Sequence, residues 1–396
     1  MPQRVESAQF QPGLEDRDVP PPPVRRGLRL LGRAAVVIAA LHAYIGWRLL
    51  PPLPAAAWPL GVAWLMLSAA LIPAAFASRG RSGRGWDALA WGGFFALGLF
   101  SSTLLLTFAR DLALLLPDTQ RWVEPSAIAV PALALLVSLS GLANARRVAR
   151  VVEVAVAIPG LPRALDGFTI AQLSDIHVGP TIKAPQVRAM VARVNALRPD
   201  LIAVTGDVVD GSVARLAAHT APLGELRARH GAWLVTGNHE YYAGVHAWIA
   251  EFERLGLRCL LNAHAVLEHD GARLVLAGVT DAQAQAFDPA HRSDAFKAID
   301  GAPAGVPRIL LAHQPRSLHD AARAGFDLQL SGHTHGGQFW PWNLFVGLQQ
   351  PLTAGLHRIG ALQVYVSRGT GYWGPPQRFG APSEITRIRL RAAAER

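Results

Sequence analysis

Cysteine is almost absent from this sequence of 396 residues, in which Cys259 is the only thiol. A single cysteine excludes an intramolecular disulfide, and the lack of further thiolates argues against a structural zinc site. The pattern GxSxG, which presents a nucleophilic serine on a sharp turn, does not occur. No internal repeat is evident either. The sequence therefore gives no support to a disulfide scaffold, a repeat protein, or covalent catalysis by serine or cysteine.

Charged residues are also scarce, at 17% of the chain, whereas 51% of the residues are hydrophobic and the mean hydropathy is +0.22. These values are high for a wholly soluble protein, so we expect part of the chain to lie in a membrane. The first residues differ, because they are polar and end in a run of prolines; we predict a disordered tail over residues 1–29. No secretory leader is expected, since its apolar core would lie close to the start.

Four apolar stretches follow, and each has close to the ~20 residues that a helix needs to span a bilayer. A soluble bundle would instead require charged faces at helical spacing, which these stretches almost lack. We therefore predict four transmembrane helices within residues 30–147. Two polar residues interrupt the pattern: we expect His42 to make a hydrogen bond within the helices and Arg48 to extend toward the bilayer surface. The stretches cover residues 34–50, 58–77, 89–106 and 127–143.

The placement of arginine predicts the orientation of these helices. Arginines gather before the first stretch, between the second and third, and after the fourth, while the alternate loops hold little besides Arg110 and Arg121. By the positive-inside rule, both the tail and the catalytic region face the cytoplasm from a multi-pass position in the inner membrane. Residues 1–150 hold 15 arginines and 8 acidic residues, a net charge of +7, against +3 for the remainder. The excess of positive charge is therefore explained by a lipid bilayer as partner rather than by nucleic acid.

After Arg150 the pattern changes to strands that alternate with helices. Such alternation is typical of an α/β fold, and we expect residues 148–396 to form two packed β-sheets flanked by helices. The predicted strands cover residues 151–158 and 168–174, several short segments within 257–278, and residues 362–367 and 385–390; the predicted helices cover 185–197, 213–228 and 244–255.

Five apolar strands of this domain end in polar residues. A single histidine at a strand end is more often a packing residue than a ligand. Open α/β sheets, however, place their sites at the carboxyl ends of their strands, so these side chains can meet. Three carboxylate or amide oxygens and four imidazoles would suffice for two ions that share one carboxylate, and this mixed set suits Mn, Fe or Zn rather than Ca or Mg. The strands end before Asp175 and His177, before Asp207, before Asn238 and His239, before His313, and before His333 and His335.

The motifs DIH, GDVVD, GNHE, an isolated histidine and GHTH, in this order, resemble the calcineurin-like metallophosphoesterase superfamily over about residues 150 to 392. The resemblance implies that Asp207 bridges two ions, that the catalytic residue His239 faces the substrate, and that Asp210 has a supporting, structural role. GNHEYY, SGHTHGGQ and SRGTGYWGPP resemble its membrane-associated branch, which includes the bacterial YkuE and YaeI proteins and hydrolases of UDP-2,3-diacylglucosamine. The implied ligands are Asp175, His177 and His335 for one ion, and Asn238, His313 and His333 for the other.

Two divalent ions can generate hydroxide from water near neutral pH, so we expect hydrolysis of a phosphodiester or pyrophosphate by metal-bound hydroxide. Residues 338–346, QFWPWNLFV, either form a lid over the core or bind a membrane surface or acyl chains. The aromatic loop, the membrane region and the family branch together favour a lipid-linked substrate such as UDP-2,3-diacylglucosamine or a phospholipid. The alternative is a membrane sensor or transport-like module whose phosphoesterase output or binding domain acts on a soluble phosphoester. The sequence leaves the oligomeric state open.

Overall fold

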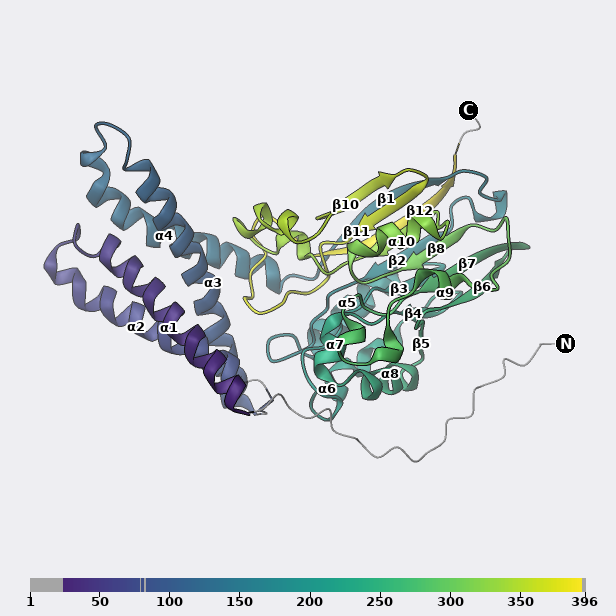
Figure 1. Ribbon diagram of the computed structural model, residues 1–396, viewed down its shortest axis with the longest axis horizontal. Coiled ribbons are helices and arrows are strands. Elements are labelled where there is room, and N and C mark those ends of the chain that lie inside the picture. The colour runs from purple at the N-terminus through teal and green to yellow at the C-terminus, as the bar shows by residue number, and fades with distance from the viewer. Residues whose placement is uncertain (1–23, 79, 82, 394–396) are drawn as a thin grey trace.

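The computed structural model of the chain describes residues 24–78, 80–81 and 83–393. It consists of a group of long helices beside an α/β domain (Figure 1). Prolines at positions 51, 52 and 54 follow the first helix and end it, because proline cannot continue the hydrogen-bond ladder of a helix. The long helices are α1 (Val24–Leu49), α2 (Trp58–Ala77), α3 (Arg84–Ala113) and α4 (Val123–Arg146).

The helical region begins earlier than the sequence analysis expected. Helix α1 starts at Val24, directly after the proline run, so residues 24–29 are helical and do not belong to a disordered tail. Proline restricts the residue before it and is well suited to a helix start, so a helix can follow it at once. Residues 1–23 of the predicted tail lie outside the described residues.

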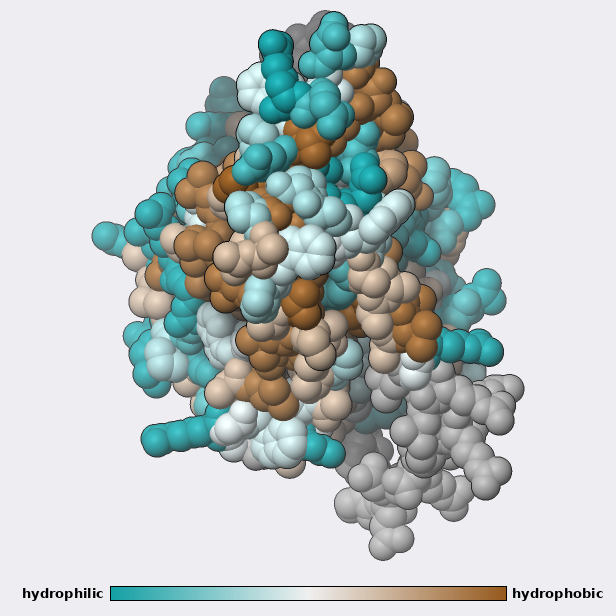
Figure 2. Space-filling model, turned by 90° about the vertical axis from the view of Figure 1, so that its left-hand side faces the viewer, coloured by the Kyte–Doolittle hydropathy of each residue, from teal (hydrophilic) through white to brown (hydrophobic). Residues whose placement is uncertain are grey.

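Three segments among the described residues are long and apolar enough to cross a membrane: Ala55–Ala77, Arg84–Ala113 and Gln120–Arg146. They contain the second, third and fourth predicted spans. Helix α1 packs against α2 and α3 but is not one of these segments, so three of the four predicted spans are candidates by length and composition and the fourth is not confirmed. Polar side chains such as His42 and Arg48 lower its hydropathy. Figure 2 views this side of the molecule, where apolar side chains gather over the helices.

His42 and Arg48 of α1 both have partners on other helices. His42 is buried; its Nδ1 lies 2.7 Å from the carbonyl oxygen of Ile38 and its Nε2 lies 3.0 Å from Ser68 Oγ, as expected for a hydrogen-bonded histidine. Arg48 Nε donates to Asp111 Oδ2 at 2.8 Å, so this arginine is held by an ion pair and does not simply extend to the bilayer surface. The partner was not foreseen, because it lies 63 positions away in the sequence.

The first sheet of the α/β domain has six strands in the order β1-β12-β2-β3-β4-β5. All neighbours are parallel except β12 and β2. The central strands β2 and β3 are buried on both faces, as is usual for strands that lie between two layers. The strands are β1 (Arg150–Ile158), β2 (Thr169–Leu173), β3 (Leu201–Val204), β4 (Ala232–Leu234), β5 (Leu257–Cys259) and β12 (Glu384–Ala392).

The second sheet also has six strands, in the order β10-β11-β9-β8-β7-β6. Its central strands β7, β8, β9 and β11 are parallel, and each edge strand is antiparallel to its neighbour. The strands are β6 (Ala263–His269), β7 (Ala272–Gly278), β8 (Arg308–Leu311), β9 (Leu328–Ser331), β10 (Gly355–Ile359) and β11 (Leu362–Val366).

The two sheets pack face to face with helices outside them, which confirms the predicted architecture (Figure 1). Ile170 and Leu201 of the first sheet share one core with Leu276 and Leu328 of the second. Separate cores lie between each sheet and its outer helices. Those helices are α5 (Ala184–Ala196), α6 (Val213–Thr220) and α8 (Val245–Arg254) on the first sheet, and α9 (Ala295–Ile299) and α10 (Leu318–Arg323) on the second.

One predicted helix is much shorter than expected. The sequence pattern predicts a helix over residues 213–228, but α6 ends at Thr220 and a 3₁₀ segment, Ala221–Glu225, follows. Pro222 has no amide hydrogen to donate to the preceding turn, which explains the early end.

The helical region and the α/β domain are in direct contact. Lys183 Nζ lies 3.2 Å from Asp87 Oδ2, near the start of α3, and Arg215 Nη1 donates to the carbonyl oxygen of Arg81 at 3.0 Å. The backbone N–H of Arg378 donates to the carbonyl oxygen of Gly141 in α4 at 2.9 Å. The α2–α3 connection and the end of α4 therefore lie on the same side of the helical region as the domain.

Candidate metal centre

The polar residues singled out in the sequence follow five strands that run toward one end of the domain. Strands β2, β3 and β4 of the first sheet are parallel to one another, as are β8 and β9 of the second. Their carboxyl ends therefore open at common edges, and the loops that follow them meet between the sheets. Among the described residues, this arrangement brings together three groups that could each hold a metal ion: Asp175, His177 and His335; Asp207, His313 and His333; and His177, Asp210 and His239, which shares His177 with the first group.

The backbone of these loops is strained at the side chains that converge. Asp175, His177, Asp207, His333 and His335 all have positive φ angles, between 51° and 71°. Left-handed backbone is uncommon outside glycine, costs of order 1–3 kcal/mol per residue, and tends to cluster at functional sites. The packing of the two sheets must hold these residues in place against that cost.

The short distance between the backbone of residue 237 and the Asp207 side chain explains why this position is glycine. A Cβ atom on Gly237 would lie 2.2 Å from Asp207 Oδ1, so no larger residue fits between β4 and this carboxylate. The GNHE motif therefore begins with glycine for a steric reason.

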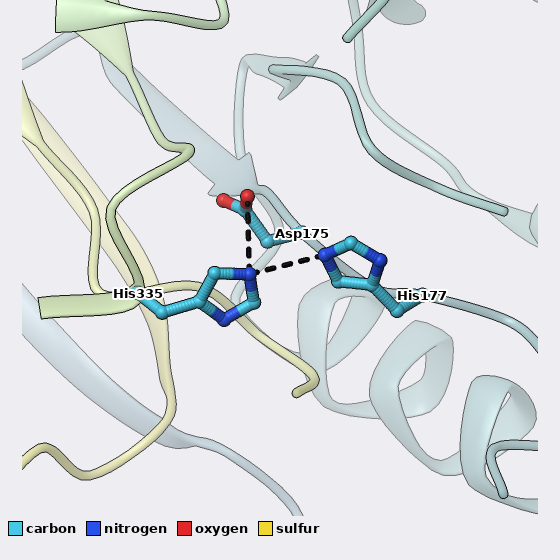
Figure 3. Close-up of side chains that lie close together, drawn as sticks. All are labelled: Asp175, His177 and His335. Carbon is cyan, nitrogen blue, oxygen red and sulfur yellow. Dashed lines mark hydrogen bonds and ion pairs between the residues drawn. The ribbon is translucent and has the colours of Figure 1, made fainter. Parts of the chain in front are cut away.

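In the first group, Asp175, His177 and His335 point toward one another (Figure 3). His177 Nε2 lies 3.0 Å from His335 Nε2, and His335 Nε2 lies 3.5 Å from Asp175 Oδ1. Ligands bonded at about 2.0–2.2 Å to a common ion stand at separations of this order. The group is buried, so its polar atoms have little access to water.

The second group has the same spacing. His313 Nε2 lies 3.1 Å from Asp207 Oδ2 and 3.1 Å from His333 Nδ1. The same Asp207 oxygen also lies 3.9 Å from His177 Nε2 of the first group. One carboxylate oxygen thus faces both groups.

The hydrogen bonding of Asn238 indicates whether the site is suited to a metal ion. Its side chain is buried, and its Oδ1 atom has no hydrogen-bond partner among the described residues. A buried amide oxygen without a partner is costly, and native proteins rarely leave one unsatisfied. A cation bound next to this oxygen would satisfy it, so the donor set fits a metal.

Burial and local charges favour the metal-binding protonation states of Asp207 and His333. Burial alone would raise the pKa of Asp207, but His313, His239 and His177 together outweigh burial and hold this pKa well below its usual range. Burial lowers the pKa of His333 to about 3, and His313 adds to the effect. Asp207 is therefore an anion and His333 a neutral imidazole at neutral pH.

His239 and Asp210 form a pair at the edge of the centre. His239 Nδ1 lies 2.5 Å from Asp210 Oδ1, and the same oxygen lies 3.0 Å from His177 Nδ1. Burial alone would lower the pKa of His239, but Asp207 and Asp210 outweigh burial and raise it to about 9. Asp210 thus orients two imidazoles through their Nδ1 atoms and leaves both Nε2 atoms directed elsewhere, a more direct role than the sequence suggested.

Glu240 was missed by sequence reasoning, although it completes the GNHE motif. It lies in α7 (Asn238–Ala243), is fully buried, and accepts hydrogen bonds from the backbone N–H groups of Asp207, Val208 and Gly237 at 2.7–3.0 Å. Burial raises its pKa to about 7, and the Asp207 charge adds to this effect. Glu240 therefore ties the loop after β3 to the loop after β4.

Replacing Glu240 with glutamine is expected to weaken both stability and metal binding. The glutamine amide would direct N–H groups at backbone N–H groups, which should lower the free energy of unfolding by about 1.5–3 kcal/mol. The displaced loops should lower metal affinity about 10- to 100-fold. Thermal unfolding and metal titration measure the two effects, and the exposed Glu253→Gln is the matched control. Unfolding and binding curves identical to those of the control would contradict this role.

Arg378 was also missed. Its guanidinium is fully buried and donates to the carbonyl oxygens of His335, Arg368 and Gly371, and its Nη2 lies 2.9 Å from His335 Nδ1. Burial lowers its pKa to about 10, so the group is charged at neutral pH. Arg378 thereby holds the GHTH loop to the segment that follows β11.

Fold and site together define a metal-dependent enzyme domain of two packed sheets with a histidine- and aspartate-lined centre. Residues 168–337 match the calcineurin-like phosphoesterase family. The chain is 31% identical over 234 residues to an uncharacterized metallophosphoesterase of Aquifex aeolicus, an alignment that covers 58% of this chain and 87% of that protein. The chain therefore belongs to the calcineurin-like metallophosphoesterases, as its motifs indicated, and its α/β domain is a phosphoester hydrolase domain that requires divalent metal ions.

Two further relatives are relevant to the question of whether the chain is associated with a membrane. The chain is 29% identical over 240 residues to the metallophosphoesterase YkuE of Bacillus subtilis, covering 59% of this chain and 82% of that protein. It is 39% identical over 266 residues, 65% of its length, to a transmembrane protein with metallophosphoesterase domain of Danio rerio. The alignment spans about three fifths (61%) of the zebrafish protein. Together with the apolar helices, this relative supports membrane association of the chain.

Proposed function

We propose that this chain is a membrane-anchored phosphoesterase that uses two divalent ions, Mn, Fe or Zn, to hydrolyse a phosphodiester or pyrophosphate in a lipid-linked substrate. Asp175, His177 and His335 would hold one ion. Asn238, His313 and His333 would hold the other, and Asp207 would bridge them. The position of Asp207 Oδ2 between the two groups and the unsatisfied Asn238 oxygen support this assignment.

Two bound ions would neutralise charge on the phosphoryl group and lower the pKa of water near it. The side chains of the protein supply the rest of the chemistry. Asp210 orients the His239 ring through Nδ1, so Nε2 can face the substrate and donate a proton to the leaving oxygen. The raised pKa of His239 keeps that proton in place at neutral pH. Asp207 stabilises the charged imidazole, because its Oδ2 lies 3.9 Å from His239 Nε2.

One observation supports the proposal that the substrate is lipid-linked. A cavity of about 530 Å³ opens from His177, Asp207, His239, His333 and His335, and its opposite wall is the aromatic loop with Phe339, Trp342, Phe345 and Val346. Its volume suits a small-molecule substrate. The side chains in and directly after the loop differ in solvent exposure. Phe339 is buried, whereas Leu344 and Leu348 are 68% and 84% exposed. It therefore combines a lid over the centre with an apolar outer surface suited to a bilayer.

The double variant Leu344→Ser, Leu348→Ser is expected to slow hydrolysis of a lipid-linked phosphodiester in vesicles about tenfold, because it removes two exposed apolar side chains that lie outside the cavity and can contact the bilayer. Hydrolysis of the soluble diester bis(p-nitrophenyl) phosphate should be unchanged. The half-exposed Val266→Ser, on β6, is the matched control. Equal losses on both substrates would assign the loop a purely structural role.

We also propose that α1 is a fourth span and that the α/β domain faces the cytoplasm. At ~1.5 Å per residue, the 26 residues of α1 exceed the ~30 Å hydrocarbon thickness of a bilayer. The contact between Arg81 and Arg215 supports this orientation, because it holds the arginine-rich α2–α3 connection against the domain.

A reporter enzyme that is active only outside the cytoplasm checks the orientation. Fused after Arg150, it should be inactive, since the positive-inside rule keeps this arginine-rich end in the cytoplasm. Fused after Pro52, between α1 and α2, it should be active. Activity after Arg150 would reverse the orientation. The same reporter fused before Val24 should be inactive, and activity there would remove α1 from the membrane-spanning helices.

A further inference from the structure

Helix α3 forms part of the wall of the catalytic cavity. Leu97 and Ser101 of this apolar helix line the same cavity as the candidate metal ligands. The Trp342 indole N–H donates a hydrogen bond to Ser101 Oγ and so attaches the aromatic loop to α3. The membrane region is thus a structural component of the cavity as well as an anchor.

The segment after Trp373 is packed tightly between α3 and α4. A Cβ atom on Gly98 of α3 would lie 2.5 Å from the Gln377 side chain, and one on Gly141 of α4 would lie 3.3 Å from the backbone of Arg378. Asn144 Nδ2 in α4 also donates to the carbonyl oxygen of Arg378 at 3.2 Å. Since Arg378 contacts His335 as well, the position of α3 relative to the metal centre is fixed by packing on both sides.

The chemistry of this cavity favours an acyl chain next to a single phosphoryl group. The described residues that line it include neither lysine nor arginine. Polar groups lie at the histidine-lined end, while Leu97, Phe345 and Val346 line the rest together with neutral side chains. A substrate with further phosphates would find no cation for them in this cavity, and burying an unpaired charge is costly.

A second cavity, of about 390 Å³, adjoins the first at His239 and Trp373, which line both. Its other lining residues include Asp210, Ser212, Arg215 and Tyr242, so it is more polar. His239 thus stands between an apolar cavity and a polar one.

We propose that the two cavities separate the two halves of a phosphodiester lipid: the acyl-bearing half lies against Leu97 and Ser101 of α3, and the polar headgroup lies beside Arg215. This inference rests on the phosphoesterase function proposed above and narrows its substrate class to a lipid with one phosphodiester. Water adds to phosphorus, the bond from phosphorus to the headgroup oxygen breaks, and His239 gives its proton to that oxygen. The products are a lipid phosphomonoester and the headgroup alcohol.

The test uses the full-length protein with Mn in vesicles that contain phosphatidylglycerol, with bis(p-nitrophenyl) phosphate as the soluble substrate. Leu97→Trp and Ser101→Leu, which fill the apolar cavity, should each lower lipid turnover about tenfold or more, and should lower the ratio of lipid turnover to turnover of the soluble diester by a similar factor. Leu112→Trp, at an exposed position of the same helix, is the matched control and should change neither rate. Mass spectrometry in H₂¹⁸O should find the label in the lipid phosphomonoester.

Three outcomes are distinct. Lipid turnover by both cavity variants equal to that of Leu112→Trp would overturn the acyl subsite. Release of diacylglycerol with labelled headgroup phosphate would reverse the placement of the two halves and overturn the proposed separation. Failure of the wild type to hydrolyse even the soluble diester would instead refute the proposed phosphoesterase function.

Discussion

Replacement of Asp207 with alanine is expected to remove both metal ions and to lower hydrolysis of any phosphodiester to the background rate, a loss of at least ~10³-fold. The reason lies in the geometry, because Asp207 Oδ2 lies within 3.9 Å of nitrogen atoms from both ligand groups. Without this carboxylate, two close cations would lack their shared counter-charge and would repel each other. Metal content per chain, measured by elemental analysis after desalting, checks this expectation directly.

Two variants provide controls for Asp207. Asp281→Ala removes another buried carboxylate, which binds the side chain of Gln314 and belongs to neither ligand group. It should destabilise the fold and keep both ions. Asp210→Ala should also keep both ions but lower the rate about 10- to 100-fold, because His177 and His239 lose the acceptor that orients them. Two ions per chain in the Asp207 variant would refute the bridging role.

Replacement of His239 with asparagine is expected to keep both ions and to lower the rate ~10²- to 10⁴-fold with an alkyl leaving group, the range typical of general acid catalysis. His239 lies at the edge of the centre, and its ring is held by Asp210 rather than directed into a ligand group with His313 or His335. The effect should be smaller with a nitrophenolate leaving group, which needs no proton. Steady-state rates with matched alkyl and nitrophenyl diesters measure the difference.

His246→Asn serves as a control for the His239 variant, because this histidine is exposed and lines neither cavity. It should change neither rate. Equal loss with both leaving groups in His239→Asn would assign His239 to substrate binding rather than proton donation. Loss of an ion would make it a metal ligand.

The sequence by itself determined the class of the domain and predicted which side chains meet at the candidate metal centre. Strand ends are local features: an apolar run followed by glycine and a polar residue shows where a strand stops, and parallel strands stop at a common edge. For this reason Asp175, Asp207 and His335 could be grouped before their distances were known. The apolar stretches were equally visible, because spanning a bilayer requires only length and apolar side chains.

The tertiary structure decided which side chains support the centre and what encloses it. Glu240 contacts a loop 33 positions earlier, and Arg378 contacts His335 at a separation of 43. Neither contact produces a periodic pattern of residues in the sequence, because hydrogen bonds between loops depend on how the two sheets pack. The same holds for α3: its apolar composition predicts a membrane helix, but only docking of the domain brings Leu97 and Ser101 into the cavity. Composition determines where a helix can reside, whereas packing determines what it faces.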